Sequence, residues 1–470
     1  MAAVDDSALA ELKRSLEGEA ILPGDPGYDE ACKGYNSMTD RRPGVIARCA
    51  SSGDVAAAIH LARESGLPVA VRCGGHSVAG LSTCDDGILI DLGGMKSIEV
   101  DPDAKLVRAG GGVLAGELDR ATQEHGLVTP TGRVTTTGVG GFTLGGGYAW
   151  ISNKWGLACD NLVSAEVVTA DGQIVTASKD ENDDLLWGLR GAGGNFGVVT
   201  SYEFKLFELG PTVLGGLALW PMSKATEVLR AWRDYVADAP DELSTACVVL
   251  TAPPEEFVPE HLQGQPCLGM AGCYIGDPEE GSSVIQPLKD LGPEVDLIEP
   301  MPYTDFQAIL DDANPPGLRN YWKGVYMTEV SDEAIDTYVE HASPPLAPMS
   351  AMVIFQLGGA VERVGDDETA FSHRDIRYLF HPISAWEDPA EDERQIAFTR
   401  EFAAAMEPFT ADSLYLNFTA ERGEDAVRAG FGDAKYERLV ALKDKYDPEN
   451  LFQLNQNIKP SKGAGAPAAA

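Results

Sequence analysis

Three glycine-rich runs lie in the first two hundred residues, and they limit what this part of the chain can build. They are residues 72–77 (RCGGHS), 132–148 (GRVTTTGVGGFTLGGGY) and 190–197 (RGAGGNFG). Because glycine has no Cβ, its backbone turns tightly and approaches a ligand closely, and the exposed N–H groups of such turns attract anions. Three runs of this kind in one half of the chain predict a large cofactor that lies along them.

Each run also has a simpler interpretation. A Gly-Gly-His turn is more often a plain β-turn than a cofactor site. The second run is not a Rossmann fingerprint, because it reads Gly138-x-Gly140-x-x-Thr143 and no clean helix is expected after it, and no Gly-Lys-Ser/Thr closes it as a P-loop. Residues 75–79 nearly spell the nucleophile elbow of a hydrolase around Ser77. That elbow needs a helix directly after the serine, whereas turn residues and a new strand follow here.

Further segments extend the pattern: residues 155–161 (WGLACDN), 184–197 (DLLWGLRGAGGNFG) and 436–458, which contains YDPENLF and ends on Asn455-Gln456-Asn457-Ile458. Taken with the glycine runs, they resemble the vanillyl-alcohol oxidase/p-cresol methylhydroxylase (PCMH) type of FAD-linked oxidoreductases, and most of all its berberine-bridge-enzyme-like branch. The likeness covers about residues 25–460, and the motifs are specific as a set.

The resemblance implies an α+β fold, in which a two-subdomain FAD-binding domain of the PCMH type joins an antiparallel-sheet substrate domain covered by helices. We expect the FAD-binding domain at residues 1–210 (core about 38–208) and the substrate domain at 211–432. Residues 433–460 return to the FAD-binding domain, and 461–470 form a flexible tail. Hydrophobic period and turn residues predict the following elements: helices 7–17, 53–66, 223–237, 279–290, 331–342 and 390–407; strands 69–72, 88–92, 98–100, 106–109, 162–169, 173–177, 198–206, 213–219, 244–251, 268–275, 352–357 and 415–418.

In the family, the histidine of the Gly-Gly-His turn carries the flavin through a bond to its 8α-methyl group, which by resemblance is His76. Many relatives add a second bond from a cysteine at the position where Val134 stands here. Valine forms no such bond, so the resemblance implies FAD attached through one histidyl link. The remaining cofactor-binding residues implied or expected from the runs are Arg72, Cys73, Gly74, Gly75, Ser77, Thr136, Thr137, Gly138, Gly140, Gly141, Asn195, Gly197, Val199 and Asn455.

A base is needed to take a proton while hydride passes to the flavin. In the strand predicted at 414–418, alternation puts Tyr415 and Asn417 on one face, and relatives place a catalytic tyrosine in such a Tyr-x-Asn motif. A cation beside the tyrosine would favour its ionisation, and Lys323 or Arg374 could supply it. Gln356, His373 and Arg374 are further candidates for lining the substrate site. The simpler alternative for Tyr415 is an ordinary half-buried aromatic side chain of a strand. For Lys323, Gln356, His373 and Arg374 it is a solvated charge or a structural hydrogen bond.

Composition restricts the partners. Lysine and arginine total 36 against 73 acidic residues, and the resulting net charge of −37 repels nucleic acid and anionic membrane. The charge is spread along the chain, which fits either an ordinary acidic enzyme or adaptation to high salt. No secretory signal or membrane span is expected, and the eight scattered cysteines indicate reduced thiols in a cytoplasmic protein without a metal site.

Together these features predict an enzyme that oxidises an alcohol or amine carbon of a small organic molecule, with O2 or another electron acceptor. A carbohydrate oxidase of the same family and a flavin-binding protein without turnover are the alternatives. The sequence leaves open whether the enzyme is an oxidase or a dehydrogenase, a choice that depends on whether oxygen reaches the reduced flavin near Thr137. It also leaves the oligomeric state open.

Overall fold

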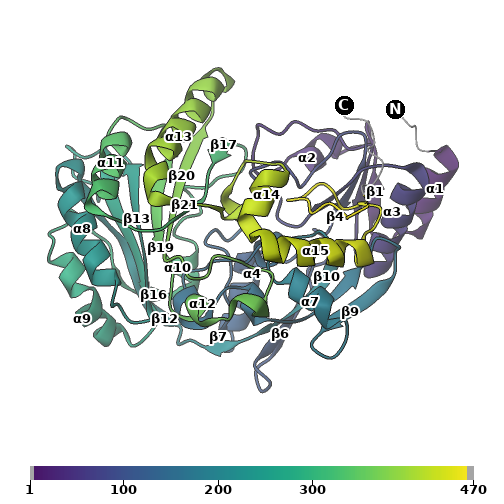
Figure 1. The fold of residues 1–470 in the computed structure, drawn as a ribbon, viewed down its shortest axis with the longest axis horizontal. Coiled ribbons are helices and arrows are strands. Elements are labelled where there is room, and N and C mark those ends of the chain that lie inside the picture. Colours follow the sequence, from purple (N-terminus) through teal and green to yellow (C-terminus); the bar gives the residue numbers. More distant parts are fainter. Residues whose placement is uncertain (1–4, 463–470) are drawn as a thin grey trace.

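The amino-terminal part of the chain builds two small sheets (Figure 1), and two of the glycine runs adjoin their strands: the run 72–77 lies at the end of Val69–Arg72, and the run 190–197 precedes Val198–Lys205. The computed structural model describes residues 5–462. The first sheet has the order β1 (Glu19–Ile21), β2 (Val45–Arg48), β4 (Ile88–Asp91), β3 (Val69–Arg72). The second has the order β5 (Ile98–Asp101), β6 (Leu106–Gly110), β10 (Val198–Lys205), β8 (Leu162–Val168), β9 (Ile174–Ser178).

In the first sheet, β4 pairs in parallel with both β2 and β3, so helix α3 must return the chain between β2 and β3. Ser51 caps this helix by accepting from the amide of Asp54, and Gly66 ends it in the left-handed region, at φ 63°. The helices of this part are α1 (Asp6–Ser15), α2 (Tyr28–Cys32), α3 (Ser52–Ser65), α4 (Ala115–Gln123), α5 (Val139–Leu144), α6 (Ser152–Trp155) and α7 (Asp183–Leu189). The short β7 (Leu127–Val128) pairs with β11 (Phe207–Glu208).

A ten-stranded antiparallel sheet forms the central part of the chain. Its order is β15 (Val295–Asp296), β12 (Thr212–Pro221), β14 (Pro266–Tyr274), β13 (Leu243–Thr251), β19 (Ala351–Gln356), β20 (Tyr378–Trp386), β18 (Val325–Met327), β21 (Thr410–Leu414), with β16 (Glu299–Pro302) beside β12 and β17 (Arg319–Trp322) beside β20. The expected α+β class is therefore confirmed. Its helices are α8 (Ala225–Val236), α9 (Pro278–Lys289), α10 (Tyr303–Gln307), α11 (Asp332–Ala342), α12 (Ala360–Arg363) and α13 (Asp392–Met406).

Alternation along the strands separates the two faces of this sheet. In β19, Met352 and Ile354 pack under helices α8, α11 and α13, whereas Val353 and Phe355 face the amino-terminal part. Figure 1 shows α8, α9 and α11 on the outer side of the sheet. The inner face is thus left to border the glycine runs, and it is rich in aromatic side chains.

Strand β20 was not expected from the sequence, because the run 378–386 (YLFHPISAW) contains a proline. A proline has no N–H for a ladder and is tolerated where pairing is interrupted. Here β17 pairs with residues 383–386 and β18 with 378–380, so Pro382 lies at the break between these two short partners. The broken edge explains how a central strand accommodates it.

The strand predicted at 415–418 is wrong. Strand β21 ends at Leu414, and the amide of Phe418 donates to the carbonyl of Tyr415 in a short 3₁₀ turn, η6 (Leu416–Phe418). The other 3₁₀ turns are η1 (Cys159–Asn161), η2 (Met222–Lys224), η3 (Asp366–Glu368), η4 (Pro389–Glu391) and η5 (Glu407–Phe409). The glycine run also holds a short helix, α5, which the sequence did not predict.

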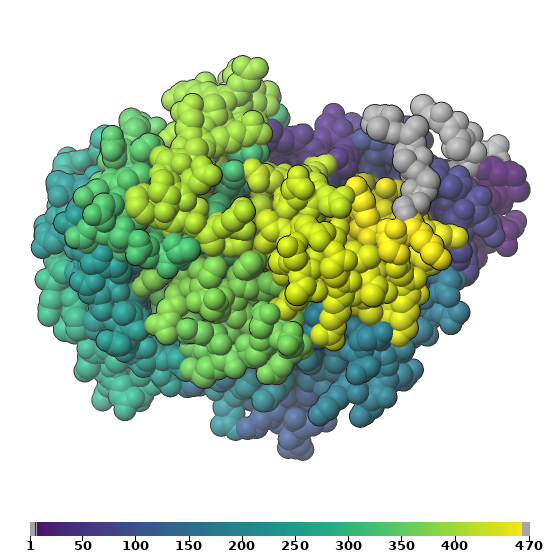
Figure 2. Space-filling model, in the orientation of Figure 1, coloured from purple at the N-terminus to yellow at the C-terminus, as the bar shows by residue number. Residues whose placement is uncertain are grey.

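The carboxyl-terminal segment returns to the amino-terminal part. Helices α14 (Glu424–Phe431) and α15 (Asp433–Tyr446) bury Phe431, Leu439 and Leu442 in the same core as β6, β8 and β10. In Figure 2 this yellow segment covers the amino-terminal part on the visible face. The domain boundaries expected at 210/211 and 432/433 stay predictions. Of the expected tail, residues 463–470 lie outside the described residues.

Candidate active site

One cavity of about 1090 Å³ separates the glycine runs from the inner face of the large sheet. Its glycine-side wall comes from all three runs, and Asn455 and Gln456 of the returning segment complete it. Its other wall carries the side chains Val248, Val353, Phe355, His381 and Phe418. The cavity therefore has a backbone-rich wall and an aromatic wall, which suits a ligand that has both phosphate and flat ring parts.

His76 lies on this cavity wall in a fixed orientation. The turn that presents it follows β3, and Gly75 at φ 72° takes the left-handed conformation that favours glycine. Nε2 of His76 lies 2.9 Å from Oγ1 of Thr136, and the Tyr35 ring stacks on the imidazole at 4.4 Å between centroids. Burial lowers the pKa of His76 to about 4, so the imidazole is neutral at physiological pH.

The first two glycine runs touch through their backbones. A Cβ added to Gly74 would lie 2.4 Å from the amide nitrogen of Gly138, and one added to Gly138 would lie 2.3 Å from the amide nitrogen of Gly74. Any larger residue at either position would separate the runs. Their amides are consequently held side by side along the cavity, as backbone recognition of an anion requires.

The predicted cofactor-binding residues divide into two groups. Those that line the cavity are Cys73, Gly74, Gly75, His76, Ser77, Thr137, Gly138, Gly140, Gly141, Gly197, Val199 and Asn455. Arg72, Thr136 and Asn195 instead hold its wall. Arg72 pairs with Asp91 at 2.8 Å, Thr136 bonds to His76, and buried Asn195 donates to the carbonyl of Gln456 and accepts from the amide of Ile458.

The residues present fit a flavin dinucleotide. Oδ1 of Asn455 is buried in the cavity wall with no hydrogen-bond partner among residues 5–462, so it is available to a ligand. A Cβ on Gly141 or Gly194 would meet nothing within 4 Å, which leaves their backbones open to close approach. By contrast, no helix follows Ser77, whose hydroxyl accepts from the amide of Leu81. The geometry of a nucleophile elbow is therefore absent from this turn.

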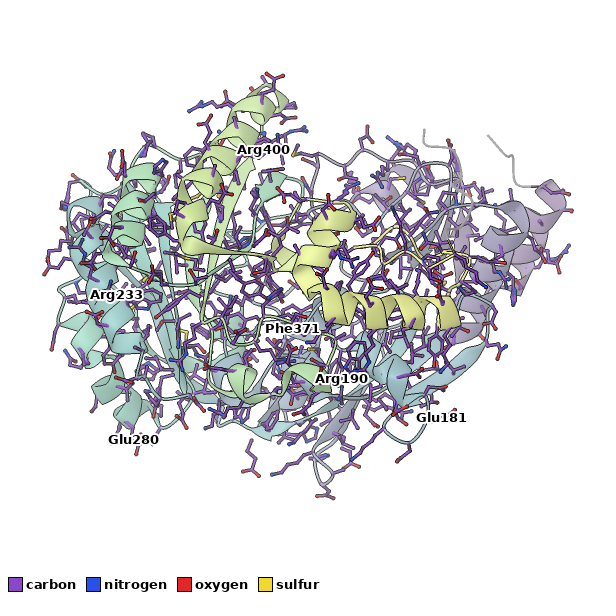
Figure 3. All side chains as sticks on the ribbon, in the orientation of Figure 1. Glu181, Arg190, Arg233, Glu280, Phe371 and Arg400 are labelled. Atoms are coloured by element: carbon purple, nitrogen blue, oxygen red, sulfur yellow. The ribbon has the colours of Figure 1, made fainter. Side chains whose placement is uncertain are left out.

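Tyr415 and Asn417 come together, though not by strand alternation. The hydroxyl of Tyr415 accepts from the amides of Gly147 and Tyr148 at 3.1 and 3.3 Å, and Nδ2 of Asn417 lies 3.4 Å away. Asn417 lines the large cavity, whereas Tyr415 lies behind its wall, beside the small apolar space next to it. Burial raises the pKa of Tyr415, and Phe371, labelled in Figure 3 between the two halves, packs against its ring.

The structure brings none of the other predicted substrate-site residues to the large cavity. Lys323 forms an ion pair with Glu421 at 2.7 Å. Gln356 accepts from Asn153, His373 bonds to the carbonyl of Ala429, and buried Arg374 pairs with Asp160 at 2.5 Å. Each of these side chains thus already bonds to the protein itself, although Nε of Arg374 has no partner among residues 5–462.

Arg133 also lines the cavity and was not predicted from the sequence. Its guanidinium lies over three rings, those of Tyr148, Trp150 and Phe355, at 4.4, 4.6 and 4.1 Å from their centroids. Burial lowers the pKa of Arg133 to about 10, while the nearby hydroxyl groups of Tyr148 and Tyr415 oppose that shift, so the side chain stays charged at neutral pH. A signal was present, since Arg133 is the one charged residue in the run 132–148.

His381 on β20 was also missed, because the strand itself was not predicted. Nδ1 of His381 lies 2.8 Å from the carbonyl oxygen of Lys323. A carbonyl only accepts, so Nδ1 carries the proton and Nε2 keeps its lone pair on the cavity side. The ring stacks on Phe418 at 4.3 Å, and burial lowers the pKa of His381 to about 4.

Comparisons with known proteins agree with this site. The family described as "FAD binding domain" matches residues 43–178, and the family described as "Berberine and berberine like" matches residues 414–459. An FAD-linked oxidoreductase of Dictyostelium discoideum is 32% identical over 96% of both chains. The chain belongs to the berberine-bridge-enzyme-like FAD-linked oxidoreductases. Its cofactor class is therefore FAD, and it is an enzyme of oxidation and reduction.

Two further relatives bear on the chemistry. The (R)-6-hydroxynicotine oxidase of Paenarthrobacter nicotinovorans is 31% identical and is matched over 95% of this chain and 97% of its own. The crystal structure of 6-hydroxy-D-nicotine oxidase from Arthrobacter nicotinovorans superposes with a TM-score of 0.87 at 30% identity, over 95% of this chain and 99% of that one. The expected two-subdomain PCMH-type fold is thereby confirmed. Among residues 5–462, no helix combines the length and apolar character that crossing a membrane requires.

Proposed function

We propose that this oxidoreductase carries its FAD on His76 alone and oxidises the alcohol or amine carbon of a small organic molecule. The observation that carries the proposal is that His76 and His381 border one cavity, at its glycine-rich and aromatic walls. A bound FAD would supply the hydride acceptor, N5 of its flavin ring, and O2 or another acceptor would reoxidise it. The relative named for hydroxynicotine supports an amine as the substrate group.

His76 has the properties that attachment to an electrophilic flavin carbon needs. Its lowered pKa keeps the imidazole neutral, so a ring nitrogen is a nucleophile at physiological pH. Thr136 and Tyr35 hold the ring in place from two sides. Val134 lines the cavity with a saturated side chain that cannot form a second bond, which supports a single link.

We assign proton transfer to His381 rather than to Tyr415. The free Nε2 of His381 lies on the cavity side and remains unprotonated at neutral pH, because its pKa is lowered to about 4. Its lone pair is placed to accept a proton from a substrate O–H or N–H, although the lowered pKa makes it a weaker base than a free imidazole. The hydroxyl oxygen of Tyr415 already accepts two backbone amides. We assign it, with Asn417, to positioning the backbone of Gly147 and Tyr148.

The attachment is tested by denaturing the purified yellow protein in acid and measuring the visible spectrum and intact mass. One FAD mass on the chain is expected, and it should be lost in His76→Ala. His125→Ala, which removes an exposed histidine of the same part, is the matched control and should keep the flavin. Flavin released from the wild type would refute the link, and two bonds per flavin would refute its being single.

Turnover is tested by screening amines, alcohols and sugars against the FAD-loaded protein, with O2 or an artificial electron acceptor. Reduction of the bound flavin by an amine or alcohol supports the proposal. Reduction by sugars alone would favour a carbohydrate oxidase, and no reduction by any class would favour a flavin-binding protein without turnover. The electron acceptor and a cytoplasmic location stay predictions.

A further inference from the structure

One cation borders the cavity without an anionic partner. Of the described residues that line the cavity, Arg133 is the single lysine or arginine. Nε and Nη1 of its guanidinium are buried and have no hydrogen-bond partner within residues 5–462, and no carboxylate in that range lies in ion-pair distance of it. The two carboxylates that line the same cavity, Glu255 and Asp312, leave it unpaired.

The protein keeps this charge in place without neutralising it. Three ring faces surround the guanidinium, and an aromatic face attracts a cation without accepting its N–H groups as a carboxylate would. Arg133 is only 9% exposed. Burying an unpaired charge is costly, and buried guanidinium groups normally meet an acidic partner, as Arg374 meets Asp160 nearby. The unpaired donors of Arg133 therefore await a partner from outside the chain.

The position of Arg133 indicates that this partner belongs to the substrate. The rings around it include Phe355, on the inner face of the large sheet, and its charge is close enough to His381 to help lower the pKa of that imidazole. The Phe355 ring under Arg133 lies 6.2 Å from the His381 ring between centroids, so a group bound by Arg133 would lie on the aromatic side of the cavity, near the proposed proton acceptor.

We propose that Arg133 binds a carboxylate of the substrate, so that this enzyme acts on an amine or alcohol that also carries a carboxylate. The planar guanidinium fork matches a carboxylate in two parallel hydrogen bonds, and the aromatic walls suit an otherwise apolar molecule. The acid group would fix the substrate so that its oxidisable carbon is presented near His381. The assignment of a substrate class rests on the proposed function, whereas the anion site does not.

The test compares carboxylates with their neutral amides on the FAD-loaded protein. Benzoate and benzamide have the same shape, as do the smaller acetate and acetamide, and binding is measured by the change in flavin absorbance and by the rise in melting temperature. We expect benzoate to bind at least tenfold more tightly than benzamide, a difference of about 1.4 kcal/mol. Arg133→Gln should abolish the preference, and Arg133→Lys should retain part of it. Arg108→Gln, at an exposed arginine, is the control and should not change it.

Equal binding of acid and amide by the wild type would overturn the proposal, and that comparison needs no variant to fold. A preference for acids that survives in Arg133→Gln would also overturn it. If the wild type shows no preference for acids and Arg133→Gln changes the flavin spectrum without any ligand, Arg133 contacts the flavin and the proposal is refuted. Because these readouts need no turnover, they separate the two proposals. A carboxylate preference that depends on Arg133, in a protein whose flavin no substrate reduces, would keep the site and refute the reaction.

Discussion

Asp119 is a buried carboxylic acid whose charge should make the stability of this protein fall as pH rises. It lies on α4, 2% exposed, and accepts from the hydroxyl of Thr131 at 2.8 Å and from Nε2 of Gln307 at 2.9 Å. Burial raises the pKa of Asp119 from 3.8 to about 7, against the opposing effect of these hydrogen bonds. Asp119, Thr131 and Gln307 thus connect the loop before Arg133 with helix α10, which belongs to the half of the molecule that holds the large sheet.

The direction of the change in stability with pH follows from whether the folded or the unfolded state holds the proton of Asp119. Between pH 4 and 7 the folded protein keeps a proton that the unfolded chain has lost, so the stabilisation is complete below about pH 4 and is lost as pH rises to about 7. A shift of about three pKa units corresponds to ~4 kcal/mol at 1.36 kcal/mol per unit. Asp119→Asn removes this titration. After rotation of its amide, Gln307 can offer Oε1, which has no partner within the described chain, to the new amide donor.

The assay is urea unfolding of the FAD-loaded protein, followed by tryptophan fluorescence at several pH values. We expect the free energy of unfolding of Asp119→Asn, relative to wild type, to increase by about 4 kcal/mol between pH 4 and pH 8. Asp103→Asn, at an exposed carboxylate, should show no such change. A difference between Asp119→Asn and wild type that stays constant with pH would refute the reasoning.

Other predictions concern the proton acceptor, the returning segment and the glycine turns. His381→Gln should slow flavin reduction by ~10²–10⁴-fold in stopped-flow measurements, with Tyr415→Phe slowing it far less; the opposite order would return the role of base to Tyr415. Lys443→Met should lower the free energy of unfolding by about 3–5 kcal/mol, because a fully buried carboxylate loses its ion-pair partner; a loss under ~1 kcal/mol, within the range of an exposed pair, would contradict this. Gly74→Ala should reduce bound FAD because its Cβ would meet the neighbouring turn, whereas Gly210→Ala, with open space around it, should not; equal flavin content in the two would refute the close-contact argument.

The glycine-side wall of the cavity could be predicted because contiguous sequence motifs form it. The turn that presents His76 and the runs that line the cavity are contiguous segments, and residues such as Gly138 and Asn455 reach the cavity as the motifs implied. Family, fold class and cofactor followed from those motifs. Arg133 stood in the same run, and its charge alone among uncharged neighbours could have identified it.

The opposite wall could not be predicted, because it is assembled by strand pairing over long sequence separations. Whether a polar side chain is free to face the cavity depends on the tertiary contacts that it makes. Gln356, His373 and Arg374 are all bonded to protein groups. His381 faces the cavity only because β20 pairs with β19 on one side and with two short strands on the other. A proline within that run concealed the strand from the sequence pattern.

The return of the carboxyl-terminal segment has a consequence for the order in which the enzyme is made. Nζ of Lys443 donates to the carbonyls of Asn195 and Phe452, and Asn455 adds its side chain to the wall, so the cavity is completed by residues that leave the ribosome after the whole central sheet. Domains generally fold as they are synthesised. The small sheets therefore gain a complete cavity wall only after synthesis has passed residue 455. We therefore expect FAD capture to follow the synthesis of this segment, and a chain interrupted before α15 to hold the cofactor less well.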